Sequence, residues 1–210
     1  VFQRLAPGIM PLSVAEGIAN GVPDVIACVR YQIRHGAKLI KVSASGGVMS
    51  HSTAPGAQQY SDAEFAAIAD EAHRAGVKVA AHAVGDRAIQ ACIRAGIDCI
   101  EHGFLASDET IQMMVDHGTF LVSTTYLTDA MAIDRIAPEL RKKALDVFPK
   151  AKTMLPKAIA AGVRIACGTD APAIPHGQNA RELCALVDRG MTPMQALRAG
   201  ECEAALAGGV

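Results

Sequence analysis

Apolar and amphipathic segments alternate along this chain in a repeating order. Five times, a stretch with helical spacing ends near a glycine, and a short run rich in Val, Ile and Ala follows. A glycine after a helix supplies a left-handed cap, and such an apolar run is typical of a buried parallel strand. The pattern therefore predicts βα units whose strands end at one shared edge. The expected strands span about 38–44, 77–82, 97–102, 120–124 and 163–168.

Helix signals fall between these runs. Ser61-Asp62-Ala63-Glu64 has the spacing of a capping box and predicts a helix to Arg74. Prolines at 138, 149 and 156 predict that the long helical stretch 128–161 is divided into two or three helices. The other expected helices span 24–34, 86–94, 107–117, 179–188 and 193–206.

Composition narrows the class of protein. The net charge of −1 and the absence of a Lys/Arg cluster argue against a nucleic-acid partner or an anionic membrane surface. No apolar run has the length of a membrane span. Six scattered cysteines without a CxxC pair indicate reduced thiols and a cytoplasmic protein. The chain starts without methionine and with no signal peptide, and we expect it to be a piece of something longer.

Four polar residues end or interrupt the predicted strands: Lys41, His82, His102 and Asp170. A single histidine at a strand end can be purely structural, and an isolated aspartate can simply cap a helix. Two histidines on neighbouring strands favour convergence on a metal, since neutral imidazole is a ligand for zinc-like ions. Beside them, Asp170 becomes a candidate ligand and proton acceptor.

Lys41 lies inside an apolar run, where burying an unpaired ammonium costs several kcal/mol. Two alternatives follow. The lysine could reach the rim and pair with Asp170 or Glu101. It could instead react with carbon dioxide to form a carbamate, a two-oxygen anion able to bridge two metals.

These segments together resemble the amidohydrolase superfamily, most closely its Xaa-Pro dipeptidase-like and imidazolonepropionase-related branch. The resemblance runs in order from about residue 20 to residue 207. No motif is specific alone, but four in order with matching strand context form a strong pattern. They are Ile40-Lys41-Val42-Ser43-Ala44-Ser45-Gly46-Gly47-Val48-Met49-Ser50, Ala81-His82-Ala83, Ile100-Glu101-His102-Gly103 and Gly168-Thr169-Asp170.

The resemblance implies a (β/α)8 barrel of the TIM type with a small β-sandwich. It makes Lys41 the carboxylated lysine of strand four, His82 and His102 the ligands of strands five and six, and Asp170 the aspartate of strand eight. The implied cofactor is a divalent metal, zinc, with one or two ions. The implied reaction is hydrolysis, in which the metal activates water and Asp170 carries a proton from water to the leaving amine.

Two departures from the family pattern stand out. The family opens with an His-x-His pair, which this sequence lacks, together with barrel strands one to three and the sandwich segments. We therefore expect residues 1–210 to form a single partial barrel of about five strand–helix units. A flat doubly wound sheet is the competing architecture, although no GxGxxG or GxxxxGK[ST] follows the first strand. Val84 stands where dipeptidase relatives often place a substrate-binding tyrosine, which weakens the peptidase assignment.

Three further residues are candidates for substrate binding. Tyr126 could donate to a tetrahedral oxyanion or only close the barrel mouth. Arg87 could bind a substrate carboxylate, or be solvated or ion-paired at a helix start. His176 lies in a loop at the expected rim.

The sequence thus predicts a metal-dependent hydrolase acting on a small amide or dipeptide. A phosphotriesterase- or lactonase-like hydrolase would use the same metals, and a catalytically inactive fragment is a third alternative, which the missing His-x-His pair favours. Unpaired strand edges also predict a homo-oligomer.

Overall fold

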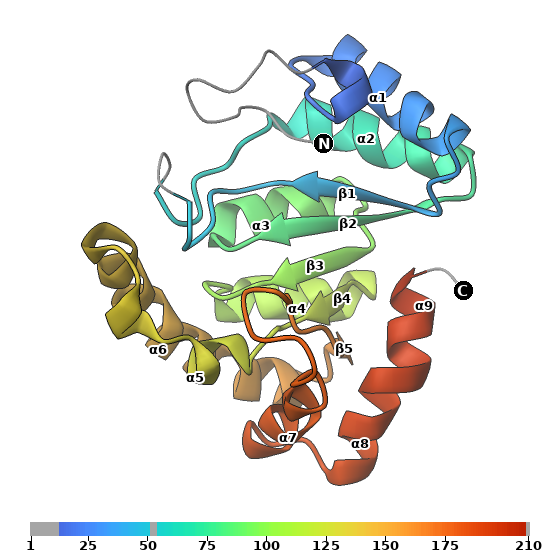
Figure 1. Ribbon diagram of the computed structural model, residues 1–210. Helices are drawn as coiled ribbons and strands as arrows, with labels where there is room; N and C mark the ends of the chain where they lie inside the picture. The colour runs from blue at the N-terminus through green and yellow to red at the C-terminus, as the bar shows by residue number, and fades with distance from the viewer. Residues whose placement is uncertain (1–12, 51–53, 209–210) are drawn as a thin grey trace.

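The computed structural model describes residues 13–50 and 54–208. Its centre is a parallel sheet of five strands in the order β1-β2-β3-β4-β5, so that each strand pairs with the next along the chain (Figure 1). The strands are β1 (Leu39–Ser43), β2 (Lys78–Ala83), β3 (Cys99–His102), β4 (Phe120–Val122) and β5 (Arg164–Ala166). This sheet confirms the predicted α/β architecture with its five strand–helix units.

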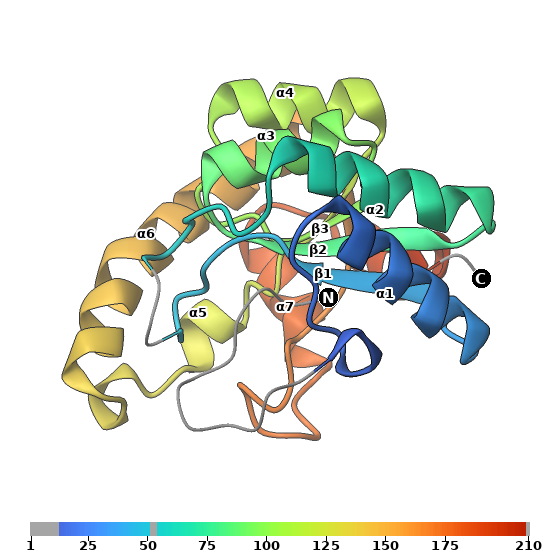
Figure 2. The same ribbon diagram turned by 90° about the horizontal axis from the view of Figure 1, so that it is seen from above.

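Helices cover one face of the sheet and its carboxyl edge. Figure 2 shows α2, α3 and α4 side by side on one side of the strands. In Figure 1 the strand arrows point toward the side where α5 and α6 lie. The α-helices are α1 (Val22–Arg34), α2 (Asp62–Arg74), α3 (Asp86–Arg94), α4 (Asp108–His117), α5 (Leu127–Ala130), α6 (Pro138–Ala161), α7 (Arg181–Asp188), α8 (Pro193–Arg198) and α9 (Ala204–Gly208). Short turns η1 (Val14–Glu16) and η2 (Ile133–Arg135) are 3₁₀, and η3 (Ala199–Glu203) is a π-helical stretch.

The local signals in the sequence are reproduced. The Ser61 side chain accepts from the Glu64 backbone N–H while the Glu64 carboxylate accepts from Ser61, which completes the capping box of α2. The five glycines that open the predicted strands all have positive φ, as left-handed caps require: Gly36, Gly76, Gly96, Gly118 and Gly162.

The interruption expected at two prolines is wrong. α6 is one continuous helix of 24 residues with Pro149 and Pro156 inside it. Each proline removes the hydrogen bond to the carbonyl four residues earlier, at Leu145 and Lys152. Both of these residues are exposed, so water can bind their carbonyls and the helix continues.

Strands β4 and β5 are shorter than predicted at the carboxyl edge. β4 stops at Val122 because Thr124 has a left-handed backbone with φ of 46°. β5 stops at Ala166 because the next backbone N–H, at Cys167, donates to the Ala199 carbonyl of η3 instead of to a strand. The polar residues that follow these strands therefore lie on turns.

Three apolar clusters hold the sheet in place; the smallest contains Ala80, Cys99, Phe120, Ala166 and Ala207, and the other two are larger. The largest lies between the sheet and the helices α1 to α4, with Phe65, Ile89 and Leu121 among its fully buried members. The second lies beyond the carboxyl ends of the strands and includes Phe104 and Phe148, whose rings meet edge to face with centroids 6.2 Å apart. This second cluster forms one side of the candidate site.

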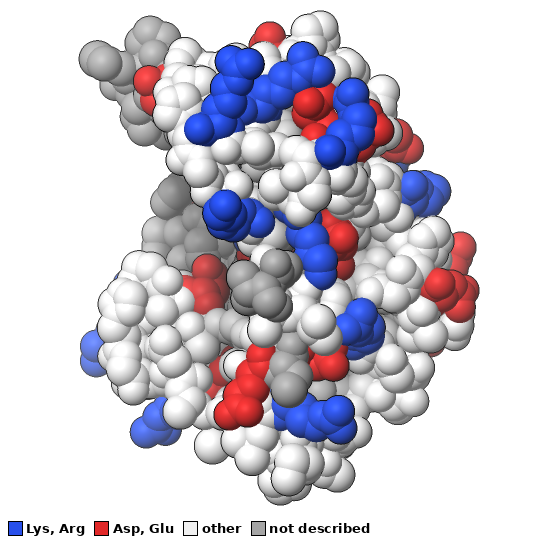
Figure 3. Space-filling model, turned by 90° about the vertical axis from the view of Figure 1, so that its right-hand side faces the viewer, with Lys and Arg blue, Asp and Glu red and all other residues white. Residues whose placement is uncertain are grey.

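Charged residues are mixed on the face opposite the strand arrowheads, where Figure 3 shows blue and red side chains interspersed. Arg30 and Arg74 both pair with the Glu71 carboxylate, at 2.8 and 2.6 Å. None of the helices in the described part of the chain is both long and apolar enough to cross a membrane. The five cysteines whose side chains the structure describes are free thiols.

Candidate active site

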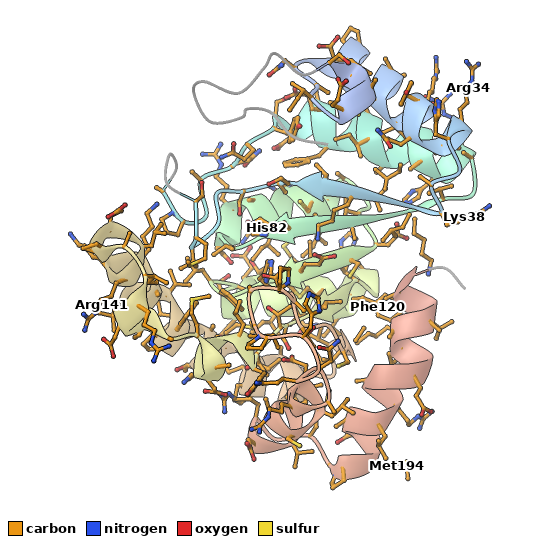
Figure 4. All side chains as sticks on the ribbon, in the orientation of Figure 1. Arg34, Lys38, His82, Phe120, Arg141 and Met194 are labelled. Carbon is orange, nitrogen blue, oxygen red and sulfur yellow. The ribbon has the colours of Figure 1, made fainter. Side chains whose placement is uncertain are left out.

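The register of the sheet places three of the polar residues on one face. Lys41 of β1 is aligned with Ala80 of β2, and His82, two residues further along β2, is aligned with Glu101 of β3. Alternate residues of a strand point to the same face, so Lys41, His82 and Glu101 share the face away from the large core. Figure 4 shows His82 toward the arrowhead end of β2, with Phe120 nearer the other end of the sheet.

His102 also lies at this site, although the regular alternation of strand residues does not place it there. Its backbone has φ of 71°, which ends β3 and turns the side chain out of the regular alternation. The His102 and His82 rings meet edge to face with centroids 4.6 Å apart. The Nδ1 atom of His102 is 2.9 Å from the Thr124 hydroxyl, which fixes the plane of the ring.

Left-handed backbone is confined to this edge among the described non-glycine residues. The three that have positive φ are His102, Thr124 and Asp170, and each follows a different strand. Such conformations cost about 1–3 kcal/mol each and persist only where surrounding contacts enforce them. Their clustering points to a functional site at the carboxyl edge, where βα proteins carry their chemistry.

Both imidazoles are held neutral. Burial, together with the nearby Lys41 ammonium, lowers the pKa of His82 to about 4. Burial likewise lowers the pKa of His102 well below its ordinary value, and His82 and Lys41 act in the same direction. Neutral imidazole is the form that binds metals, so both rings are available as ligands near neutral pH.

Lys41 forms an ion pair with Glu101, one of the two carboxylates that the sequence suggested as partners. Desolvation lowers the pKa of Lys41, while Cys99 and Asp170 act against that shift. Desolvation also raises the pKa of Asp170, and Lys41 opposes it. Lys41 and Asp170, 129 positions apart in the sequence, thus lie close enough to influence each other's titration.

A cavity of about 430 Å³ opens over these residues. His82, His102 and Asp170 line its polar end. An apolar wall of the same cavity is formed by Val48, Val84, Phe104, Leu127, Met131 and Phe148. The Phe104 ring of this wall packs against the His102 ring, with centroids 5.4 Å apart. The site can therefore hold a molecule that presents a polar group to the histidines and an apolar group to the wall.

The loop after β1 closes another side of the cavity. A Cβ atom on Gly47 would lie 3.1 Å from Nε2 of His82, a tight contact that glycine avoids, so this backbone can lie close to the ring. The Ser45 hydroxyl accepts from the backbone N–H of Val84 at 2.8 Å, which ties the loop to the end of β2. The Ser-Gly-Gly sequence thus serves close packing against an imidazole.

The donor set fits a metal under one condition. Within residues 13–50 and 54–208, no three His, Cys, Asp or Glu side chains are grouped closely enough to hold a metal ion. The two neutral imidazoles are grouped, and Lys41 shares the face of His82. A metal at this site would therefore depend on an oxygen donor attached to Lys41, on a shift of Asp170, or on both.

The three residues expected to bind substrate lie elsewhere. Arg87 lines a separate surface hollow with Gln58 and Tyr60. The Tyr126 hydroxyl donates to Oε1 of Gln178 at 3.0 Å. His176 is exposed in the loop after β5 and is not among the residues that line the main cavity. Their roles in binding remain predictions.

Two residues near the site escaped sequence reasoning. Thr124 contacts His102 directly, and the buried Glu182 of α7 binds the turn that carries Thr124. Thr124 belongs to the run that ends the fourth predicted strand, which was the only signal for it. Glu182 gave none, because its partners lie 56 to 59 positions away.

Comparison with known proteins identifies relatives with the same fold. The chain is 39% identical over 196 residues to ochratoxinase of Aspergillus niger, covering 91% of this chain and 40% of that protein. A crystal structure of a Xaa-Pro dipeptidase with bound methionine in the active site superposes with a TM-score of 0.91 at 31% identity, covering 98% of this chain and 52% of that one. A prolidase complexed with N-methylphosphonate-L-proline gives a TM-score of 0.85 at 34% identity, covering 91% of this chain and 48% of that one.

The chain thus spans about half the length of these relatives or less. Residues 5–207 match the Amidohydrolase family, a range that contains the whole extent over which the motifs suggested that resemblance. The recognition made from four short motifs is confirmed: this chain belongs to the amidohydrolase family.

Proposed function

We propose that this site hydrolyses the C–N bond of a small amide with the help of a divalent metal, most simply zinc. The observation that carries the proposal is the pair of neutral imidazoles, His82 and His102, in edge-to-face contact at the polar end of a cavity that Asp170 also lines. Two neutral imidazoles at the carboxyl edge of a βα sheet are ligands suited to zinc, and Asp170 lines the same cavity as a group that can carry a proton.

His82, His102 and Lys41 would hold the metal. Bound there, the metal would polarise the amide carbonyl and lower the pKa of water toward neutrality. Lys41 supplies an oxygen donor once its neutral amine attacks carbon dioxide, forms an N–C bond and loses a proton to give a carbamate. The lowered pKa of Lys41 favours that reaction because only the neutral amine is nucleophilic.

Asp170 is proposed as the proton carrier. It would accept the proton of the attacking water and deliver it to the nitrogen that leaves. Desolvation raises its pKa, which brings the carboxyl group closer to the operating pH that general acid–base catalysis favours.

The proposed substrate is a small amide with a bulky apolar group. Phe104, Leu127 and Phe148 line the same cavity as the two histidines, and no Lys or Arg is among the described residues that line it. This wall suits an apolar side chain better than a second charged group. The neighbours are consistent with that choice, because one was solved with methionine in its active site.

The test measures zinc content and turnover in the same preparation. After incubation with zinc and bicarbonate, we expect at least one zinc per chain and release of amine from N-acyl amino acids and dipeptides with apolar residues. Asp170→Asn should retain zinc and lose turnover. Faster turnover of phosphotriesters or lactones would instead favour the other metal hydrolases, and absence of both zinc and turnover would favour an inactive fragment.

A further inference from the structure

Glu182 is a fully buried carboxylate in the first turn of α7, outside the lining of the cavity. A buried carboxylate requires donors, because desolvation without hydrogen bonds is costly. Glu182 obtains all its recorded donors from the turn that follows β4. Its position therefore couples α7 to that turn.

The contacts are short and consecutive. Oε1 of Glu182 accepts from the backbone N–H of Thr125 at 2.7 Å, and Oε2 accepts from the backbone N–H of Tyr126 at 2.7 Å. The Ser123 hydroxyl contributes a longer bond to Oε1, at 3.4 Å. One side chain thus fixes two successive peptide planes.

Thr124 is the residue whose backbone these contacts constrain. Its φ of 46° lies in the left-handed region, which β-branched residues rarely adopt. The N–H of Thr125 belongs to the peptide plane that directly follows the Thr124 Cα, so its bond to Glu182 fixes the ψ torsion of Thr124. Glu182 therefore restrains the backbone of Thr124, together with the backbone N–H of Leu127, which donates to the Thr124 carbonyl at 3.2 Å.

Two further contacts join the turn and α5 to residues that flank α7. Tyr126 donates to Gln178, and Asp129 accepts two bonds from Arg189 at 2.9 and 2.8 Å. Neither of these contacts involves the peptide plane that follows Thr124. Within the described residues, Glu182 is the side chain recorded as binding that plane.

The held conformation aims the Thr124 hydroxyl at Nδ1 of His102, 2.9 Å away. A threonine hydroxyl can donate or accept; where it accepts from a protonated Nδ1, the lone pair of Nε2 is left free for a ligand in the cavity. We propose that Glu182 is a positioning residue, which fixes the orientation and tautomer of the His102 ring through Thr124. The role of the His102 ring as a metal ligand rests on the proposed function. The link from Glu182 through Thr124 to His102 does not.

The test compares two buried glutamates of the full chain. Glu182→Gln keeps the shape of the side chain but points an NH₂ group at backbone donors. Glu64→Gln is the matched control, since Glu64 also accepts from two backbone N–H groups, those of Gly21 and Ser61, at 2.8 Å each. Long-range ¹H–¹⁵N correlation of ¹⁵N-histidine-labelled protein reports the tautomer of each ring without metal or substrate.

We expect a single tautomer for His102 in the wild type and in Glu64→Gln. In Glu182→Gln we expect a mixture, with averaged Nδ1 and Nε2 shifts, and a zinc affinity about 10- to 100-fold weaker. Glu182→Asp keeps the carboxylate but shortens the side chain, and we expect the same changes in its spectrum and zinc affinity. It replaces Glu182→Gln in the comparison if that variant does not fold.

An unchanged His102 spectrum in a folded Glu182 variant overturns the proposal, as does an equal change in Glu64→Gln. The spectra could change as expected while no form of the protein binds zinc. That result would support the positioning role of Glu182 and contradict the proposed metal site.

Discussion

The amino-terminal turns of α2 and α7 each contain a buried glutamate that accepts hydrogen bonds from two backbone N–H groups. The two glutamates nevertheless have different roles. Glu64 closes the capping box of its own helix and binds Gly21 near α1. Glu182 binds a distant turn, and that turn contacts the ring of His102. The first region stabilises a helix end, whereas the second continues into the candidate site. The comparison teaches that the partners of a buried carboxylate, rather than its burial, decide what it does.

The largest expected difference between the two regions is in zinc binding. Each region has a histidine: His73 on α2, 2.8 Å from the Asp98 carboxylate, and His102 beside Thr124. His102→Ala should weaken zinc binding by at least about 1,000-fold, or about 4 kcal/mol, because it removes a ligand. His73→Ala should leave the affinity unchanged. Competition titration against a chromophoric chelator measures the zinc affinity of both variants. Equal losses of affinity would show that the two regions do not differ in zinc binding.

The second difference is in pH dependence, where the two glutamates have opposite signs. Burial raises the pKa of Glu182 to about 7, against the lowering effect of its three donors. The folded state then keeps a proton that the unfolded state releases above about pH 4.5, so stability falls as the pH rises from there to about 7. The shift corresponds to about 3 kcal/mol of unfolding free energy, which Glu182→Gln should abolish.

At Glu64 the hydrogen bonds to Ser61 and Gly21 outweigh burial and lower the pKa. Its contribution to stability is therefore present above the unfolded pKa and is lost as the pH falls through the folded one. Urea denaturation between pH 4 and 8, for the wild type and both Gln variants, separates the two slopes. Slopes of the same sign would show that the two carboxylates do not differ in this way.

The third difference concerns two nearby threonines, Thr124 in the turn after β4 and Thr128 in α5. Thr124→Val removes the hydroxyl that contacts His102, and we expect zinc affinity to fall about 10- to 100-fold. Thr128→Val removes a hydroxyl that donates to the Thr125 carbonyl at 2.8 Å and has no recorded contact with the ring. Its zinc affinity should remain at the wild-type value. Calorimetric titration compares them, and a loss shared by both variants would assign the effect to the turn as a whole.

The smallest expected effect is that of truncating the α2 cap. Glu64→Ala should reduce the unfolding free energy by about 1–2 kcal/mol, since two backbone N–H groups lose their acceptor at a helix end that water can reach. Zinc affinity should not change. Thermal and urea unfolding measure the change in unfolding free energy. A change in zinc affinity would show that α2 influences the site and would contradict the separation of the two regions.

The same two regions show what sequence can predict. The capping box was readable because Ser61 and Glu64 are three residues apart, and the strands were readable from glycine caps and apolar runs. Lys41, His82 and His102 were found because they end or interrupt such runs. These signals are local, so they survive in the folded chain.

The remainder depends on contacts between distant segments. Glu182 and Thr125 are 57 positions apart, and no local pattern joins them. The left-handed backbone of Thr124 runs against its β propensity and is enforced by tertiary contacts. The continuity of α6 through Pro149 and Pro156 likewise depends on which carbonyls face water, which periodicity alone did not reveal.

The central claim is that His82 and His102 act together on one metal ion. Crystals of the protein grown with zinc and bicarbonate, and measured at the zinc absorption edge, test it most directly. The account predicts an anomalous peak within about 2.1 Å of one nitrogen from each ring, with density for a carbamate on Lys41. Zinc bound elsewhere, with these two rings in contact but unliganded, would contradict it.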